Sequence, residues 1–326
     1  MTDDLNINKT IYMTYNKSVP DYVFNKWTDL NSDFKIDFSL DNECIDFIKD
    51  NFNDALVDVF KNIKRGAHKA DLWRLCKLYI NGGIYADVDL VPYLNINNLD
   101  KDVTFYTCLS AINQSCFQAF MVNFSKPRNP LILSFLITLI LNKPFNDDIG
   151  PTKDMYNTLN YNIDTITKDT KYHINTVRIP VEIGNSKRNI KKINLLYFPK
   201  LSKISINILS NKNLKETFSA KIQDTFLIIK KSSNSTTGWK QNLKVEIEIP
   251  SKEVIYLFKE HWGARGYTDA YVTYKNIKIL DSRDCCYSEK HGFMIGGRPV
   301  KKAKWGKTRT SRNRDRKLTK FYKRNT

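Results

Sequence analysis

One stretch of this chain decides its fold and its chemistry: Ala70-Asp71-Leu72-Trp73-Arg74-Leu75-Cys76-Lys77-Leu78-Tyr79-Ile80-Asn81-Gly82-Gly83-Ile84-Tyr85-Ala86-Asp87-Val88-Asp89-Leu90. In its first half, apolar residues recur three, four and seven positions apart, which predicts a helix with one apolar face: Leu72, Leu75, Cys76 and Tyr79. Asn81-Gly82-Gly83 predicts the end of that helix, because glycine accepts the left-handed conformation that caps a last turn.

The residues after the two glycines alternate in polarity, which predicts a short strand. Four apolar residues should point to one face of it, and Tyr85, Asp87 and Asp89 to the other. Two carboxylates about 7 Å apart on one strand face repel each other unless a cation lies beside them. Ligand sets made of oxygen alone suit Mg²⁺ or Mn²⁺ better than zinc. The pair therefore predicts a divalent-cation site.

The parts of this stretch are ordinary when they are taken singly. Asp-x-Asp is common in solvated turns, and Gly-Gly after a helix is a normal stop. Asp71 and Arg74 are three residues apart, a spacing that usually gives a surface ion pair contributing a few tenths of a kcal/mol. Their conjunction with an aromatic residue and two acids on one strand face is hard to explain by packing alone. We interpret the stretch as a binding site.

The arrangement resembles the sugar-binding region of the DXD-containing glycosyltransferases related to the yeast initiating α-1,6-mannosyltransferase, and the same pattern occurs in the large clostridial glucosylating toxins. That motif consists of Asp, two residues, Arg, then Gly-Gly, Tyr and Asp-x-Asp. It is filled here without insertions by Asp71, Arg74, Gly82, Gly83, Tyr85, Asp87 and Asp89. Weaker similarity extends over roughly residues 10–265.

The resemblance implies a GT-A fold and transfer of a hexose from a nucleoside-diphosphate sugar to a glycan or protein acceptor, with retention of configuration. It implies that Asp89 binds Mn²⁺ (or Mg²⁺) directly and that Asp87 contacts the metal or the ribose of the nucleotide. Asp71 and Arg74 would then bind hydroxyl groups of the donor sugar, and Tyr85 would pack beside it.

Three outlying segments extend the resemblance. Residues 11–15 resemble the family's first strand, which contacts the nucleotide, so Thr14 and Tyr15 are candidate nucleotide-binding residues; Tyr15 replaces the usual Trp. Residues 260–265 resemble the family's closing His element without its Ser-Trp, and they make His261 a further candidate metal or phosphate contact. Residues 148–151 resemble a Thr-Gly-Pro turn.

Length and composition are consistent with one large α/β domain. The chain has 326 residues, of which 41% are hydrophobic, and this excludes a wholly disordered protein. Strands alternate with helices before the Asp-x-Asp motif, which favours a nucleotide-binding α/β sandwich with its ligand at the carboxyl ends of the strands. Residues 172–260 are rich in predicted strands, with 221–231 and 243–249 as a β-hairpin around Ser232-Ser233-Asn234-Ser235.

The net charge of +18 is unevenly distributed along the chain. Residues 298–326 hold thirteen Lys and Arg and one Asp, a net charge of +12, with few apolar residues. We therefore divide the chain into a catalytic domain at 1–295 and a disordered basic tail at 296–326 that contacts polyanions. A tail that only aids solubility or sorting is the alternative.

The sequence favours a reducing compartment. Its six cysteines lack zinc-site spacing, and no apolar run approaches 18 residues. The first residues contain neither a basic segment nor an apolar one, so we expect no signal peptide and no membrane anchor. The expected location is the cytoplasm, or the host cytoplasm or virion if the chain is viral, without a transmembrane segment.

Two other functions compete with the transferase. One is a nucleic-acid-binding protein that acts through the basic tail, and the other is a metal-dependent nuclease, since paired Asp residues also serve two-metal phosphodiester chemistry. Neither explains why Asp71, Arg74 and the two glycines occur together.

Overall fold

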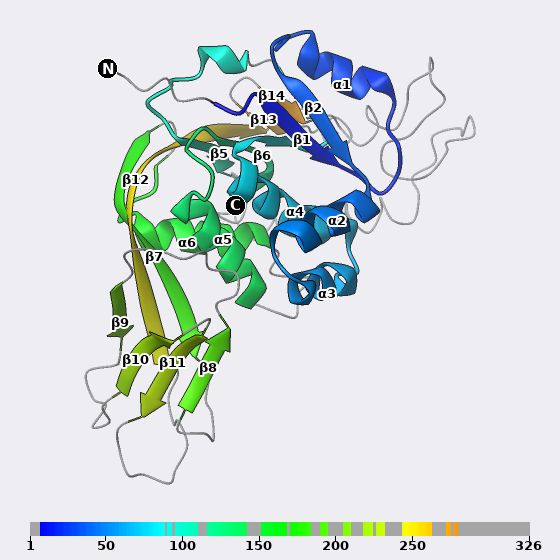
Figure 1. Ribbon diagram of the computed structural model, residues 1–326. Helices are drawn as coiled ribbons and strands as arrows, with labels where there is room; N and C mark the ends of the chain where they lie inside the picture. The colour runs from blue at the N-terminus through cyan, green and yellow to red at the C-terminus, as the bar shows by residue number, and fades with distance from the viewer. Residues whose placement is uncertain are drawn as a thin grey trace, which may run out of the picture.

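A mixed β-sheet forms the centre of the molecule, with helices on both faces and a smaller sheet to one side (Figure 1). The computed structural model describes residues 7–88, 90–92, 95–109, 116–141, 151–167, 170–183, 190–194, 205–209, 218–223, 226–231, 243–262, 272–274 and 277–279. The predicted boundary at residue 295 and the basic tail lie outside these residues.

Strands and helices alternate in the first half of the chain. The elements are β1 (Thr10–Thr14), α1 (Asp21–Thr28), β2 (Lys35–Ser39), α2 (Asp41–Asn51), α3 (Asp54–Asn62), α4 (Gly66–Asn81), β3 (Gly83–Ala86), β4 (Leu90–Pro92), the 3-10 helix η1 (Ile96–Asn98), β5 (Phe105–Leu109) and β6 (Cys116–Asn123). The predicted helix, its glycine stop and the short strand are confirmed by α4 and β3.

The second half begins with two helices and continues mainly as strands. The elements are α5 (Pro130–Leu141), α6 (Pro151–Asn162), β7 (Lys171–Ile183), β8 (Ile190–Asn194), β9 (Ser205–Leu209), β10 (Phe218–Gln223), β11 (Phe226–Lys231), β12 (Leu243–Trp262), β13 (Val272–Tyr274) and β14 (Ile277–Ile279). The mixed α/β class is confirmed. Among the described residues, none of the helices combines the length and the apolar character needed to cross a bilayer.

Strand directions place the motif at one edge of the central sheet. Strand β1 pairs in parallel with both β2 and β3, so the carboxyl ends of all three strands share that edge. Strand β6 then pairs antiparallel with β3 and β5, and β5 pairs in parallel with β12. Asp87 follows β3 directly and therefore lies at the carboxyl edge, where open α/β sheets bind ligands.

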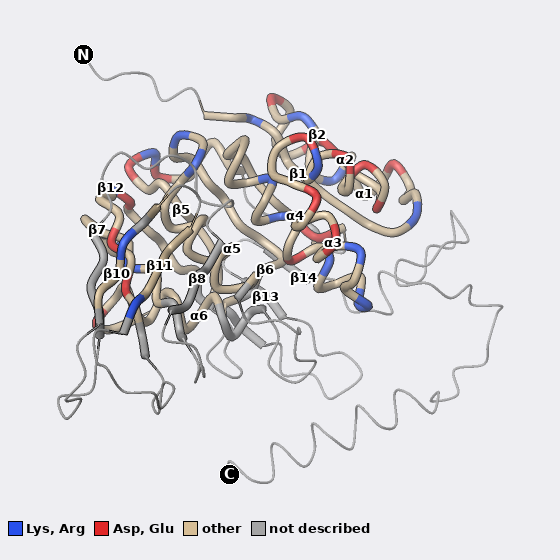
Figure 2. The backbone as a smooth tube through the Cα atoms, turned by 60° about the horizontal axis from the view of Figure 1, so that its bottom comes forward, with Lys and Arg blue, Asp and Glu red and all other residues tan. Residues whose placement is uncertain are grey.

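Two apolar cores cover the two faces of this sheet. On one face, Tyr12, Tyr85 and Met121 pack against helices α2 to α6. On the other, the apolar set of β3 and Leu90 pack with α1 through Val23 and Trp27. The predicted alternation along β3 is thus confirmed as far as Asp87. Figure 2 shows the charged residues on the outer elements, while α5 and β6 carry none.

Helix α4 is buried on nearly all sides, and not only along its predicted apolar face. All nine residues from Asp71 to Tyr79 are buried. Polar side chains on such a helix must find partners inside the protein, because an unpaired buried charge is costly. Lys77 does so by pairing with Asp37 at 3.0 Å and lying over the rings of Phe47 and Tyr12.

Gly83 is required where α4 turns into β3. Its φ is +87°, and a Cβ there would lie 2.9 Å from the carbonyl oxygen of Thr10. We expect Gly83→Ala to lower the free energy of unfolding by about 2–4 kcal/mol, because both the left-handed backbone and a backbone clash oppose the methyl group. Urea denaturation measures this difference.

The matched control is Gly66→Ala at the start of the same helix, where an added Cβ meets nothing within 4 Å. That change should be neutral or stabilising by up to about 1 kcal/mol, since alanine favours the helix. Equal effects of the two substitutions would contradict the steric explanation.

The hairpin predicted between residues 221–231 and 243–249 is wrong. Residues 218–231 themselves form a hairpin, in which β10 and β11 pair antiparallel from Phe218↔Lys231 to Gln223↔Phe226. The long strand β12 pairs with β7, β9, β5 and β13. The sequence signals a turn more strongly at Ser232-Ser233-Asn234-Ser235 than between the two strands, so residues 221–231 were read as one continuous strand.

Candidate functional site

Arg74 is the centre of the site. It lies on α4, is 3% exposed, and its Nε donates to the Ala70 carbonyl oxygen at 3.1 Å. Its Nη1 donates to the Gln118 carbonyl oxygen on β6. Its Nη2 lies 3.1 Å from Oδ1 of Asp71 and 3.4 Å from Oδ1 of Asp87. The guanidinium thus links helix α4, strand β6 and Asp87, the first acid of the Asp-x-Asp motif.

Tyr85 fixes the orientation of these groups from the strand side. Its ring is fully buried, and the guanidinium carbon of Arg74 lies 4.2 Å from the ring centroid. Its hydroxyl donates to Oδ1 of Asp87 at 2.6 Å. Burial raises the pKa of the Tyr85 phenol well above 10, so this group stays a hydrogen-bond donor. Tyr85 and Arg74 therefore both bind the same oxygen of Asp87.

Asp71 is a buried carboxylate held by one arginine. Burial raises its pKa from 3.8 to about 6, although Arg74 opposes the rise, and the nearby Asp87 adds to it. The sequence predicted the i,i+3 pair with Arg74 but not its burial. The pair is therefore a buried ion pair and not a surface one, because the side chains of Arg74 and Asp71 are only 3% and 9% exposed to solvent.

Asp87 connects this buried cluster to solvent. Its backbone N–H donates to the Ala119 carbonyl oxygen at 2.9 Å, and its own carbonyl oxygen accepts from Leu90 at 3.1 Å, which forms a tight turn. The side chain is 33% exposed, and within the described residues only Oδ1 has partners.

This arrangement fits a hard divalent cation at the turn. A partly exposed carboxylate whose orientation is fixed by a tyrosine and an arginine is a suitable source of oxygen ligands. Asp89, the predicted direct ligand, lies outside the described residues. In the part of the chain that the structure describes, no group of three His, Cys, Asp or Glu side chains is arranged to hold a metal.

Thr14 and Tyr15 lie at the same carboxyl edge, at the end of β1. The Thr14 hydroxyl donates to the Ser39 carbonyl oxygen at 2.8 Å and lies 3.3 Å from Sγ of Cys44. The backbone N–H of Tyr15 donates to the same Ser39 oxygen at 3.4 Å. The structure therefore places both predicted nucleotide-binding residues at the carboxyl end of β1, beside the end of β2.

His261 belongs to a more distant strand. It lies near the end of β12, opposite Thr273 of β13, and β12 follows β3, β6 and β5 in the sheet order. Because β12 is parallel to β5, its end points toward the same edge as Asp87. The side chain of His261 is not among those described, so its predicted contact stays a prediction.

Sequence reasoning missed the contribution of β6. The carbonyl oxygens of Gln118 and Ala119 hold Arg74 and the backbone of Asp87. They lie where the pairing of β5 with β6 shifts register between Tyr106 and Cys108. No local sequence pattern around Gln118 predicts these contacts, because every residue type has the same main-chain carbonyl oxygen. Only the pairing of β3 with β6 could have revealed them.

Part of the chain is similar in sequence to a described family. Residues 8–106 match the model of a family described as a glycosyltransferase sugar-binding region containing a DXD motif. This part of the chain is thus similar to a DXD glycosyltransferase sugar-binding region. The match begins just before β1 and ends within β5. It contains Asp71, Arg74, Tyr85 and Asp87, but not the two carbonyl oxygens of β6 that contact Arg74 and Asp87. The resemblance predicted from residues 71–89 is confirmed.

Two individual proteins are similar to parts of the chain. An uncharacterized glycosyltransferase of Acanthamoeba polyphaga mimivirus is 30% identical over 102 residues, which is 31% of this chain and 41% of that protein. The chain thus matches less than half the length of this relative. The solved PaToxG glycosyltransferase aligns over 48% of this chain and 68% of its own, with 15% identity and a TM-score of 0.37.

Proposed function

We propose that this chain is a metal-dependent glycosyltransferase with a GT-A-like fold. It moves a hexose from a nucleoside-diphosphate sugar to a glycan or protein acceptor with retention of configuration. The observation that carries the proposal is the buried cluster of Asp71, Arg74 and Tyr85. This cluster supports the partly exposed Asp87 carboxylate at the carboxyl edge of three parallel strands.

The charges that develop during the reaction explain why carboxylates and a cation are needed at this site. Breaking the bond between sugar and nucleotide increases the negative charge on the pyrophosphate leaving group. Mn²⁺ or Mg²⁺, held by Asp87 and Asp89, would supply positive charge at that leaving group. In this proposal the Tyr85 hydroxyl and Arg74 keep the Asp87 carboxylate in one orientation, so that little reorganisation is needed when the donor binds.

The buried end of the cluster would recognise the sugar. Asp71 is an acceptor fixed by Arg74, and such polar contacts discriminate between sugars that differ in one hydroxyl. Tyr85 would pack beside the donor, Thr14 and Tyr15 would bind the nucleotide, and His261 would contact metal or phosphate. No catalytic nucleophile is assigned.

A panel of nucleoside-diphosphate sugars tests this function directly. Each donor is incubated with the full chain and Mn²⁺, and the released nucleoside diphosphate and free sugar are measured. We expect one or two donors to be hydrolysed slowly, because water can take the place of the acceptor when no acceptor is present. Cleavage of DNA or RNA under the same conditions, without hydrolysis of any donor, would favour the nuclease instead.

The basic tail has a separate role in this proposal, namely contact with polyanions. We expect a chain ending at Gly297 to keep donor hydrolysis and to lose most of its affinity for heparin or DNA, because residues 298–326 carry a net charge of +12. In the full chain this affinity should fall steeply with salt, as counterion release requires. Fluorescence anisotropy at several salt concentrations measures both effects. Unchanged polyanion binding after truncation would instead favour a nucleic-acid-binding core.

A further inference from the structure

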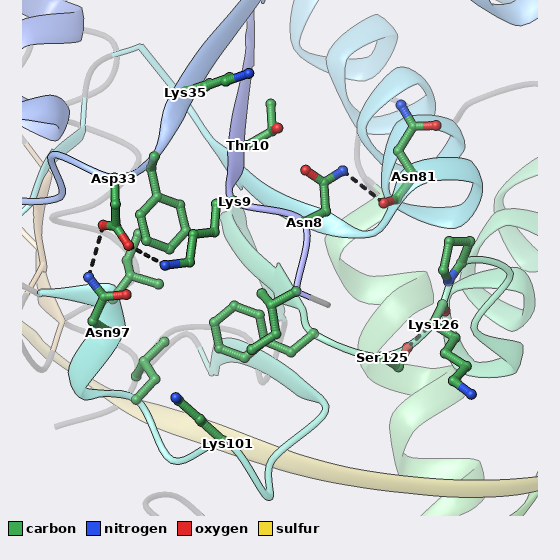
Figure 3. A pocket seen from close by; sticks show the side chains of 16 residues that line it. Asn8, Lys9, Thr10, Asp33, Lys35, Asn81, Asn97, Lys101, Ser125 and Lys126 are labelled. Atoms are coloured by element: carbon green, nitrogen blue, oxygen red, sulfur yellow. Dashed lines mark hydrogen bonds and ion pairs between the residues drawn. The ribbon is translucent and has the colours of Figure 1, made fainter. Parts of the chain in front are cut away.

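A pocket opens at the opposite edge of the central sheet from the DXD motif (Figure 3). It lies where β1 and β2 begin and α4 ends, and its lining includes Thr10, Lys35 and Asn81. The parallel strands separate it from Asp87, which follows the other end of β3. The pocket is therefore no part of the proposed donor site.

The floor of this pocket is apolar. Phe34, Ile96 and Phe124 contribute to the lining and are 5%, 1% and 5% exposed. Ile7 and Leu99 are half-buried beside them. The two phenylalanine rings are too covered to stack on a flat ligand, and Lys9 lies over the ring of Phe34. An aliphatic side chain of a ligand can pack against the edges of these rings.

The rim of the pocket is strongly positive. Four lysines and one aspartate line it, a net charge of +3. Asp33 is already occupied, because it pairs with Lys9 and accepts from the side-chain amide of Asn97 at 2.9 Å. Within the described residues, no carboxylate pairs with the other three lysines, which are all exposed: Lys35, Lys101 and Lys126.

These three lysines come from separate elements and surround the pocket in Figure 3. Lys35 begins β2, Lys101 follows η1, and Lys126 follows β6. Of the acids that flank Lys101 in sequence, Asp100 pairs with Lys171, and neither Asp100 nor Asp102 lines the pocket. Positive charges held apart around a concave apolar floor suit an extended ligand with several negative charges.

We propose that this pocket binds an acidic peptide segment of a protein partner, with an aliphatic residue on the floor and carboxylates at the three lysines. The covered phenylalanine rings disfavour single-stranded nucleic acid, whose bases bind by stacking on exposed aromatics. The concave shape does not match a flat bilayer surface. Because the pocket is remote from Asp87, the proposal is independent of the proposed catalytic function.

The test uses the full chain and a short fluorescent peptide in which Glu alternates with Leu. The triple variant Lys35→Ala, Lys101→Ala and Lys126→Ala should bind this peptide at least about tenfold more weakly at low salt, and the difference should shrink as salt screens the charges. The control variant Lys49→Ala, Lys61→Ala and Lys64→Ala removes the same charge from exposed positions on and after α2 and α3, and should bind almost as the wild type.

The comparison between the two triple variants cancels the contribution of the basic tail, which both retain. Each single variant should give a partial loss, so the result does not depend on the triple variant folding. Equal affinity of the two triple variants would overturn the proposal. A peptide with Gln in place of Glu that binds equally well would also overturn it, as would a larger loss for a single-stranded oligonucleotide than for the acidic peptide.

Discussion

Replacing Asp89 by Asn is expected to reduce donor hydrolysis and transfer by about 100-fold or more. Asp89 shares the motif with Asp87, whose carboxylate is oriented by Tyr85 and Arg74 and exposed to solvent. An amide keeps the size of the side chain but removes the charge that binds a divalent cation. EDTA should inactivate the wild type to a similar degree, and Mn²⁺ should restore it.

Two measurements distinguish loss of the metal from loss of the fold. The melting temperature of the Asp89→Asn protein should match that of the control Asp50→Asn, an exposed residue of α2. Titration with Mn²⁺ should show weaker binding only for Asp89→Asn. Full activity of the wild type in excess chelator would contradict the metal-dependent mechanism, and the transferase would then need another source of positive charge.

Replacing Arg74 by Lys is expected to lower both turnover and stability. A lysine has one ammonium group in place of the planar fork that contacts Ala70, Gln118, Asp71 and Asp87. We expect turnover to fall about 10- to 100-fold and the free energy of unfolding to fall by roughly 1–3 kcal/mol, because buried acceptors lose their partners. Steady-state kinetics and urea denaturation measure the two effects.

The control for this substitution is Arg178→Lys, at a side chain that is 51% exposed and lies near Glu246 and Glu248. Because the arginine is half exposed and lies 3.5–3.8 Å from the two carboxylates, the change to lysine keeps the charge and should alter stability by at most about 1 kcal/mol, and turnover should not change much. If Arg74→Lys were as mild as Arg178→Lys, the buried cluster would have no special role in the chemistry.

Asp71→Asn separates turnover from stability at the same site. The pKa of Asp71 is raised from 3.8 to about 6, so the stability that this group contributes is complete below about pH 4 and is lost as the pH rises to about 6. At neutral pH the folded protein therefore carries a carboxylate whose ionised form is disfavoured by burial. We expect Asp71→Asn to lower turnover strongly while the free energy of unfolding changes little at pH 7. A large loss of stability together with normal turnover would make Asp71 a purely structural residue.

The sequence by itself determined the local features of the site. Helical spacing from Leu72 to Tyr79 and the stop at Gly82-Gly83 predicted α4 and its end, and alternation from Ile84 onward placed Tyr85 and Asp87 on one face. These features depend on backbone geometry and on the contrast between apolar and polar side chains within a few residues. Such short-range preferences can be read without knowing the rest of the fold.

The tertiary structure alone decided the burial of the Asp71–Arg74 pair and the identity of its remaining partners. The pair looks like a surface ion bridge in the sequence, yet it is enclosed between α4 and strand β6, whose Gln118 carbonyl lies 44 residues away along the chain. The same limit explains the hairpin that was wrongly placed between residues 221–231 and 243–249. Pairing between strands is set by how the whole chain packs its apolar faces, and main-chain acceptors have no residue-type signature, so neither can be read from local pattern.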